Sequence, residues 1–90
     1  MEYRLADAKY VRDFVVWVRF SDGVKGEIDL KSELYGPIFE PLKATAVFKQ
    51  FRIHPELRTL VWENGADFSP EFLHDKAKSE HSTTHSSGQR

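Results

Sequence analysis

Apolar and polar residues alternate along two stretches of the N-terminal half of the chain, which indicates two half-buried β-strands. Residues 10–20 are rich in aromatic and β-branched side chains, and in residues 24–31 apolar residues alternate with charged ones. A Ser-Asp-Gly sequence at 21–23 separates the two stretches. The pattern predicts a β-hairpin, and the weakly patterned residues 1–9 predict an edge strand beside it.

The register of this hairpin follows from the residues that it would bury. A two-residue turn at Asp22 and Gly23 would place charged residues beside the apolar ones. A three-residue turn with Gly23 in a left-handed conformation pairs Phe20 with Val24 instead, and it gathers the apolar positions of both strands on one face. We therefore expect the three-residue turn, which leaves Trp17 on the outer face of the hairpin.

Two prolines determine the helices expected in the middle of the chain. Pro37 suits the first position of a helix, whereas Pro41 argues against one continuous helix over residues 37–49. We expect two short helices instead, at residues 37–42 and 45–50. The side chains expected to face the sheet are Ile38, Phe39, Leu42, Val47 and Phe48.

The C-terminal half predicts a second hairpin and a further helix. Apolar residues at 51–53 and 58–62 flank a turn at Pro55, so two antiparallel strands are expected. Ser69 followed by Pro70 is a favourable helix N-terminus.

Beyond this helix start the composition changes, and the change predicts the domain boundary. Residues 76–90 contain no large apolar side chain, so their burial could not offset the loss of chain entropy on ordering. We predict one α+β domain over residues 1–76 and a disordered polar tail over residues 77–90. The expected architecture is a small two-layer domain. Its antiparallel sheet has three N-terminal strands, a helical connection and a C-terminal hairpin, with short helices on one face.

Charge and composition narrow the classes of function. Thirteen basic and fourteen acidic residues give a net charge of −1, whereas nucleic-acid-binding domains usually carry a basic excess. The absence of cysteine excludes disulfides and thiolate metal sites. The N-terminus lacks the features of a signal peptide, and the longest apolar run is far shorter than the ~20 residues that span a membrane. We expect a soluble cytoplasmic protein with no membrane contact.

Residue patterns typical of catalysis or cofactor binding are weak in this chain. The glycines occur singly at turns and form no phosphate-binding loop. His81 and His85 have a spacing that suits metal ligands on a helix, but their polar surroundings favour a solvated tail. Asp67 and His54 remain as candidates for an enzyme or small-ligand site, and each is also explained by a turn. We predict a protein that is not an enzyme and that uses no cofactor or metal.

Aromatic and arginine side chains expected at the surface are candidates for partner contacts, because these residue types dominate interface energetics. The candidates are Trp17, Tyr35, Arg52 and Arg58. For Trp17 the structural alternative is packing against the aliphatic parts of Arg19 and Lys25. Aromatic rings interleaved with arginine are also suited to stacking on nucleic-acid bases. A homodimer through a sheet edge or the Trp17 face is a further alternative.

Four motifs together resemble a small bacterial family, the domain-of-unknown-function family numbered 2442. They are FSDG at 20–23, IDL at 28–30, GPIFEPL at 36–42 and WENGADFSPE at 62–71. The resemblance covers about residues 3–75 and departs at Ala44, where such sequences often carry an acidic residue. It implies an α+β fold, in agreement with the residue pattern.

The resemblance also bears on function, although it supplies no catalytic residues. Members are often encoded beside another small protein in a toxin–antitoxin-like pairing, and some are fused to a helix-turn-helix domain. The leading hypothesis is therefore a protein-interaction or regulatory module, as one half of such a pair. A nucleic-acid-binding regulatory domain is the first alternative, and a small-ligand-binding domain or an enzyme is the second.

Overall fold

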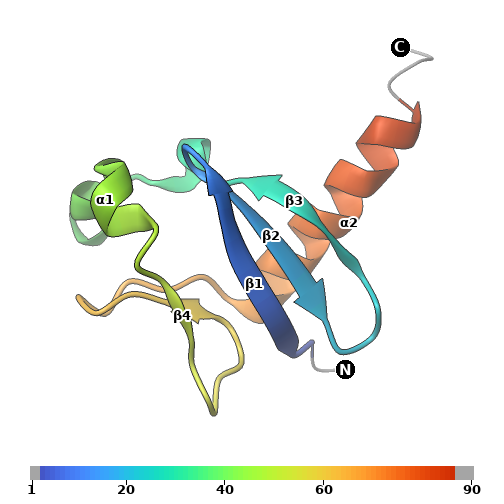
Figure 1. The fold of residues 1–90 in the computed structure, drawn as a ribbon, viewed down its shortest axis with the longest axis horizontal. Coiled ribbons are helices and arrows are strands. Elements are labelled where there is room, and N and C mark those ends of the chain that lie inside the picture. Colours follow the sequence, from blue (N-terminus) through green and yellow to red (C-terminus); the bar gives the residue numbers. More distant parts are fainter. Residues whose placement is uncertain (1–2, 87–90) are drawn as a thin grey trace.

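The fold is α+β and has two layers, as the sequence predicts (Figure 1). The computed structural model describes the backbone of residues 3–86 and the side chains of residues 3–78. A three-stranded antiparallel sheet has the order β1-β2-β3, and β4 and β5 form a separate antiparallel pair. The strands are β1 (Leu5–Arg12), β2 (Val15–Phe20), β3 (Lys25–Asp29), β4 (Arg52–Ile53) and β5 (Leu60–Val61).

Helices cover one face and one end of the three-stranded sheet. The longest, α2, runs diagonally across the sheet and packs mainly against β3 (Figure 1). The elements η1, η2 and α1 form the helical connection between β3 and β4. The helices are η1 (Lys31–Glu33), η2 (Pro37–Lys43), α1 (Thr45–Phe48) and α2 (Pro70–Ser86).

The turn between β2 and β3 has the predicted three-residue form. Gly23 has a φ of +96°, a left-handed value that residues with a Cβ rarely adopt. The amide of Phe20 donates a hydrogen bond to the carbonyl of Val24 at 2.8 Å, which confirms the predicted pairing. The apolar positions of both strands consequently share one face, and Val16 and Ile28 are fully buried there.

The prediction of one strand over residues 10–20 is wrong, because the chain reverses within that stretch. The reversal occurs at Asp13, whose φ of +43° lies in the left-handed region that aspartate tolerates better than most residues. Phe14 follows and packs edge-to-face against Phe48 at a centroid distance of 5.2 Å. Apolar alternation continues through the turn, so the sequence pattern does not reveal the break.

The helical connection contains the two predicted short helices, η2 and α1, after η1, but two of its side chains point away from the core. Ile38 is 46% exposed and Val47 is 38% exposed, which corrects the prediction that both face the sheet. In a 3₁₀ helix, residues three apart lie on the same side, so η2 directs Phe39 and Leu42 inward and Ile38 outward. The single turn of α1 buries Phe48, and its neighbour Val47 faces solvent.

The start of α2 is confirmed and its length is not. The hydroxyl of Ser69 accepts a hydrogen bond from the amide of Phe72 at 3.1 Å, which is the expected N-cap. One and two turns further on, Leu73 and Ala77 are fully buried. The helix continues to Ser86, so it is not one of the short helices that the sequence predicts.

The predicted boundary between residues 76 and 77 falls within α2. The buried side chain of Ala77 places this residue in the packed domain, and the backbone is helical from there to Ser86. A helix satisfies its backbone hydrogen bonds internally, so a polar composition does not exclude a helical backbone. The remainder of the predicted disordered tail, residues 87–90, lies outside the described residues.

The second hairpin is confirmed and joins the core through Trp62. The indole nitrogen of Trp62 donates a hydrogen bond to the carbonyl of Phe48 at 2.8 Å, and the two rings lie 5.7 Å apart. The amide of Leu5 donates to the carbonyl of Arg58 at 3.0 Å, which connects the hairpin loop to the start of β1. The hairpin thus lies beside β1 and contributes to the same core.

Candidate functional site

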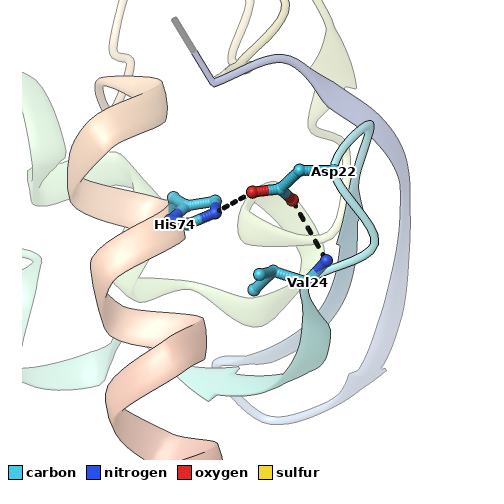
Figure 2. Close-up of polar contacts among 3 residues, drawn as sticks. All are labelled: Asp22, Val24 and His74. Atoms are coloured by element: carbon cyan, nitrogen blue, oxygen red, sulfur yellow. Dashed lines mark hydrogen bonds and ion pairs between the residues drawn. The ribbon is translucent and has the colours of Figure 1, made fainter. Parts of the chain in front are cut away.

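A hydrogen-bonded pair, Asp22 and His74, joins the β2–β3 turn to α2 (Figure 2). The Oδ2 atom of Asp22 lies 2.8 Å from Nε2 of His74, although the two residues are 52 positions apart in the sequence. The Oδ1 atom of Asp22 accepts a hydrogen bond from the amide of Val24 at 3.1 Å. One carboxylate therefore stabilises the turn and holds the helix against it.

The imidazole of His74 is enclosed by aromatic rings. Tyr3 stacks on it with a centroid distance of 3.7 Å and an interplanar angle of 11°. Phe20 approaches edge-on at 4.9 Å. The His74 side chain is only 6% exposed, whereas that of Asp22 is 43% exposed.

The hydrogen bonds to Asp22 lower the pKa of its carboxyl group below the ordinary value of 3.8. The largest cause is the backbone amide of Val24, and the hydrogen bond to His74 comes next. The carboxylate is therefore ionised near neutral pH, where it can accept both hydrogen bonds.

A histidine–carboxylate pair can serve acid–base catalysis when a nucleophile or substrate reaches the free ring nitrogen. In this pair, Tyr3 and Phe20 cover the ring of His74, and Asp22 occupies its Nε2 atom. A shallow hollow of about 420 Å³ adjoins the pair. Its charged lining residues are of both signs: Glu71, Asp75 and Lys78. The geometry suits a structural lock between two elements.

A second surface feature is a groove between the helical connection and the start of α2, which we call the aromatic groove. It is formed by Tyr35, Phe39, Phe68 and Phe72 and encloses about 260 Å³. The rings of Phe39 and Phe68 stack at 5.0 Å, and those of Phe68 and Phe72 stack at 5.4 Å. Tyr35 lies at the rim and is 70% exposed.

The charged side chains that line the aromatic groove are acidic. Asp67 is exposed, and the carboxylate of Glu33 lies 4.0 Å from the ammonium group of Lys76. The Glu33 side chain is 26% exposed, so that pair is partly shielded from solvent. The groove thus combines an apolar floor with an acidic rim.

Two of the sequence candidates, Trp17 and Tyr35, belong to different elements of the fold. Trp17 is half-buried on the face of the sheet opposite Val16, and the ammonium group of Lys9 lies 5.9 Å from its ring centroid. The lysine comes from β1, and the packing of Trp17 against the aliphatic parts of Arg19 and Lys25 stays a prediction. Tyr35 follows η1 and is the candidate that the structure places in a groove.

The other two candidates, Arg52 and Arg58, belong to the β4–β5 hairpin. Arg52 is exposed on β4 and pairs through its backbone with Val61. Arg58 is half-buried in the loop with a φ of +52°, a strained value for a residue with a Cβ. The four candidates therefore come from three separate parts of the chain and not from one cluster.

The two weak candidates for catalysis have different environments. The Nδ1 atom of His54 accepts hydrogen bonds from the amides of Glu56 and Leu57, at 3.1 and 3.0 Å, so the imidazole stabilises its own turn. Asp67 lies in an isolated β-bridge with Val61 and lines the aromatic groove. Neither residue lines the hollow beside His74.

Sequence reasoning missed both the Asp22–His74 pair and the aromatic groove. It assigned Asp22 to a turn, which is correct, but no local signal connects that turn to His74. The groove depends on Phe39, Phe68 and Phe72, which read as ordinary core positions. Their spacing along the chain carries no motif.

Neither a candidate metal site nor a membrane-spanning helix occurs in the described part of the chain. No group of three histidine, aspartate or glutamate side chains there could hold a metal ion. None of the helices in that part combines the length and the apolar character needed to cross a bilayer.

These features define a small α+β domain with an Asp–His lock and an aromatic surface groove. The chain belongs to the DUF2442 family, described as proteins of unknown function, whose profile matches residues 5–79. This match confirms the resemblance drawn from the sequence motifs. Comparisons with curated proteins and with solved structures gave no match.

Proposed function

We propose that this protein is an interaction module that binds another protein through the aromatic groove. The observation that supports the proposal is the exposed ring of Tyr35 beside the stacked rings of Phe39, Phe68 and Phe72. Tyrosine and phenylalanine bring large contact areas at a small entropic cost, and they are enriched at protein interfaces. The biological setting that we propose is one half of a toxin–antitoxin-like pair.

The positions of the polar side chains also favour binding over catalysis. The best candidate for acid–base chemistry, His74, is enclosed by Tyr3 and Phe20 and hydrogen-bonded to Asp22. The next candidate, His54, is engaged with the amides of its own turn. The exposed apolar side chains, by contrast, are left available for a partner.

Affinity capture from native lysate tests the proposal. Tagged wild-type protein and the variant Tyr35→Ser would be compared, with and without nuclease, and retained proteins would be quantified by mass spectrometry. We expect a stoichiometric protein that the wild type retains after nuclease treatment and that Tyr35→Ser loses. Leu57→Ser is the matched control, because Leu57 is likewise exposed, at 55%, but lies in the β4–β5 loop.

Each other outcome counts against the proposal. A captured protein that both variants retain would place the interface elsewhere on the molecule. Capture that disappears with nuclease would favour the nucleic-acid-binding alternative. Circular dichroism would confirm that both variants remain folded, so that loss of capture reports on the surface.

A further inference from the structure

The size of the aromatic groove limits what it can hold. Its volume of about 260 Å³ is below the roughly 300–1,000 Å³ of sites that enclose a drug-sized ligand or cofactor. Its floor is a continuous stack of three phenylalanine rings, of which Phe68 is 8% exposed. A hollow of this size and character suits one large apolar side chain, which stacks on the rings.

The charge around the groove indicates the neighbours of that side chain. Asp67 has no opposing cation among the described residues that line the groove, whereas the carboxylate of Glu33 is paired with Lys76 at 4.0 Å. A partner that docks here meets an acidic rim, so lysine or arginine beside its apolar anchor is favoured and acidic residues are disfavoured. A complementary partner segment is therefore apolar in its centre and basic on both sides of that centre.

On the basis of the proposed function, we infer that the aromatic groove binds an extended basic segment of the partner protein and takes up one of its aromatic or large aliphatic side chains. In an extended segment, alternate residues face the same side at a spacing of about 7 Å. An apolar residue with lysine or arginine two positions away therefore presents both groups to the groove and its rim. The apolar side chain of the partner packs on the rings of Phe39, Phe68 and Phe72.

Three synthetic peptides test this inference. The first is a capped heptapeptide with a central phenylalanine and a lysine two positions away on each side. The second has glutamate in place of both lysines, and the third has alanine in place of phenylalanine. Each would be titrated into the ¹⁵N-labelled full chain, and amide shifts would give both the affinity and the site.

The lysine–phenylalanine peptide should shift the amides of Tyr35, Phe39 and Phe68. It should bind about tenfold more tightly than the glutamate peptide at low salt, since two surface charge contacts each contribute modestly. The preference for the lysine–phenylalanine peptide over the glutamate peptide should decrease as the salt concentration increases. The alanine peptide should show no saturable shift in the groove.

A charge reversal at the rim provides the second test. In the variant Asp67→Lys the preference should invert, with the glutamate peptide binding more tightly than the lysine peptide. Glu56→Lys is the matched control, because it changes the net charge equally at an exposed position in the β4–β5 loop. The control should keep the wild-type order of affinities.

Three results with the peptides would overturn the inference. They are equal affinities for the lysine and glutamate peptides, shifts that map outside the groove, and the absence of binding by all three peptides. Concentration-dependent shifts of the groove amides without peptide would assign the groove to a second copy of the chain, which also overturns it. Capture of a lysate protein that depends on Tyr35 would still uphold the proposed function, so the two failures are distinguishable.

Discussion

At the scale of single residues, Asp22 shows how one side chain can serve two elements. Its Oδ1 atom accepts the amide of Val24 within the turn, and its Oδ2 atom accepts a hydrogen bond from His74 on α2. Asp before Gly is common in turns for the first of these reasons alone. The second role exists only because the helix passes beside the turn.

Neutralising this carboxylate should remove a pH-dependent contribution to stability. The pKa of Asp22 is lower in the folded chain than its ordinary value of 3.8, so the folded state binds this proton less readily than the unfolded state. The contribution is therefore fully present above pH 3.8 and is lost as the pH falls through the folded pKa. Urea denaturation of wild type and Asp22→Asn should show a difference at neutral pH that shrinks in acid.

The control for this measurement is Asp75→Asn, which neutralises an exposed carboxylate on α2. Its unfolding free energy should follow that of the wild type at every pH. Parallel pH profiles for the wild type and Asp22→Asn would contradict the role assigned to Asp22.

At the scale of elements, the two tryptophans have opposite roles. Trp62 on the second hairpin is 3% exposed and donates a buried hydrogen bond to the carbonyl of Phe48 on α1. Trp17 on β2 lies on the outer face under Lys9, where solvent reaches it. The first joins two elements through the core, and the second covers a sheet surface.

Replacing each tryptophan by phenylalanine should separate these roles. Trp62→Phe should reduce the free energy of unfolding by about 1–3 kcal/mol, because the carbonyl of Phe48 loses its partner in the core. Trp17→Phe should change it by no more than about 0.5 kcal/mol. Urea denaturation monitored by far-ultraviolet circular dichroism compares the two, and equal losses would argue against the core role of Trp62.

At the scale of the whole molecule, a three-stranded sheet and a short hairpin share one core that α2 closes. Among the described side chains, the core contributions of this helix end with Ala77. The family match ends close by, at residue 79. Both observations show that the packed domain extends at least to the middle of the helix.

Truncation tests this boundary. A chain that ends at residue 79 should unfold at the same urea concentration as the full chain, because it keeps Ala77. A chain that ends at residue 76 should lose about 1 kcal/mol or more, since it removes a buried methyl group and shortens the helix. Marked destabilisation of the chain that ends at residue 79 would show that the later turns of α2 contribute to the fold.

Local sequence patterns are sufficient to predict several elements of the fold. The three-residue turn at Gly23, the helix start at Ser69 and the second hairpin each depend on neighbouring residues alone, and each is present. The reversal at Asp13 was missed, because apolar alternation continues through it. The outward positions of Ile38 and Val47 depend on 3₁₀ geometry and on the short length of α1, which composition does not specify.

The sequence by itself determined the fold class, the hairpin register and the family, because these depend on periodicity, turn residues and contiguous motifs. Only the tertiary structure decided which chemistry-bearing side chains meet. Asp22 and His74 are 52 positions apart, and the aromatic groove combines Tyr35 and Phe39 with residues of α2 and the preceding loop. Such contacts arise from the packing of whole elements, for which neighbouring residues carry no local signal.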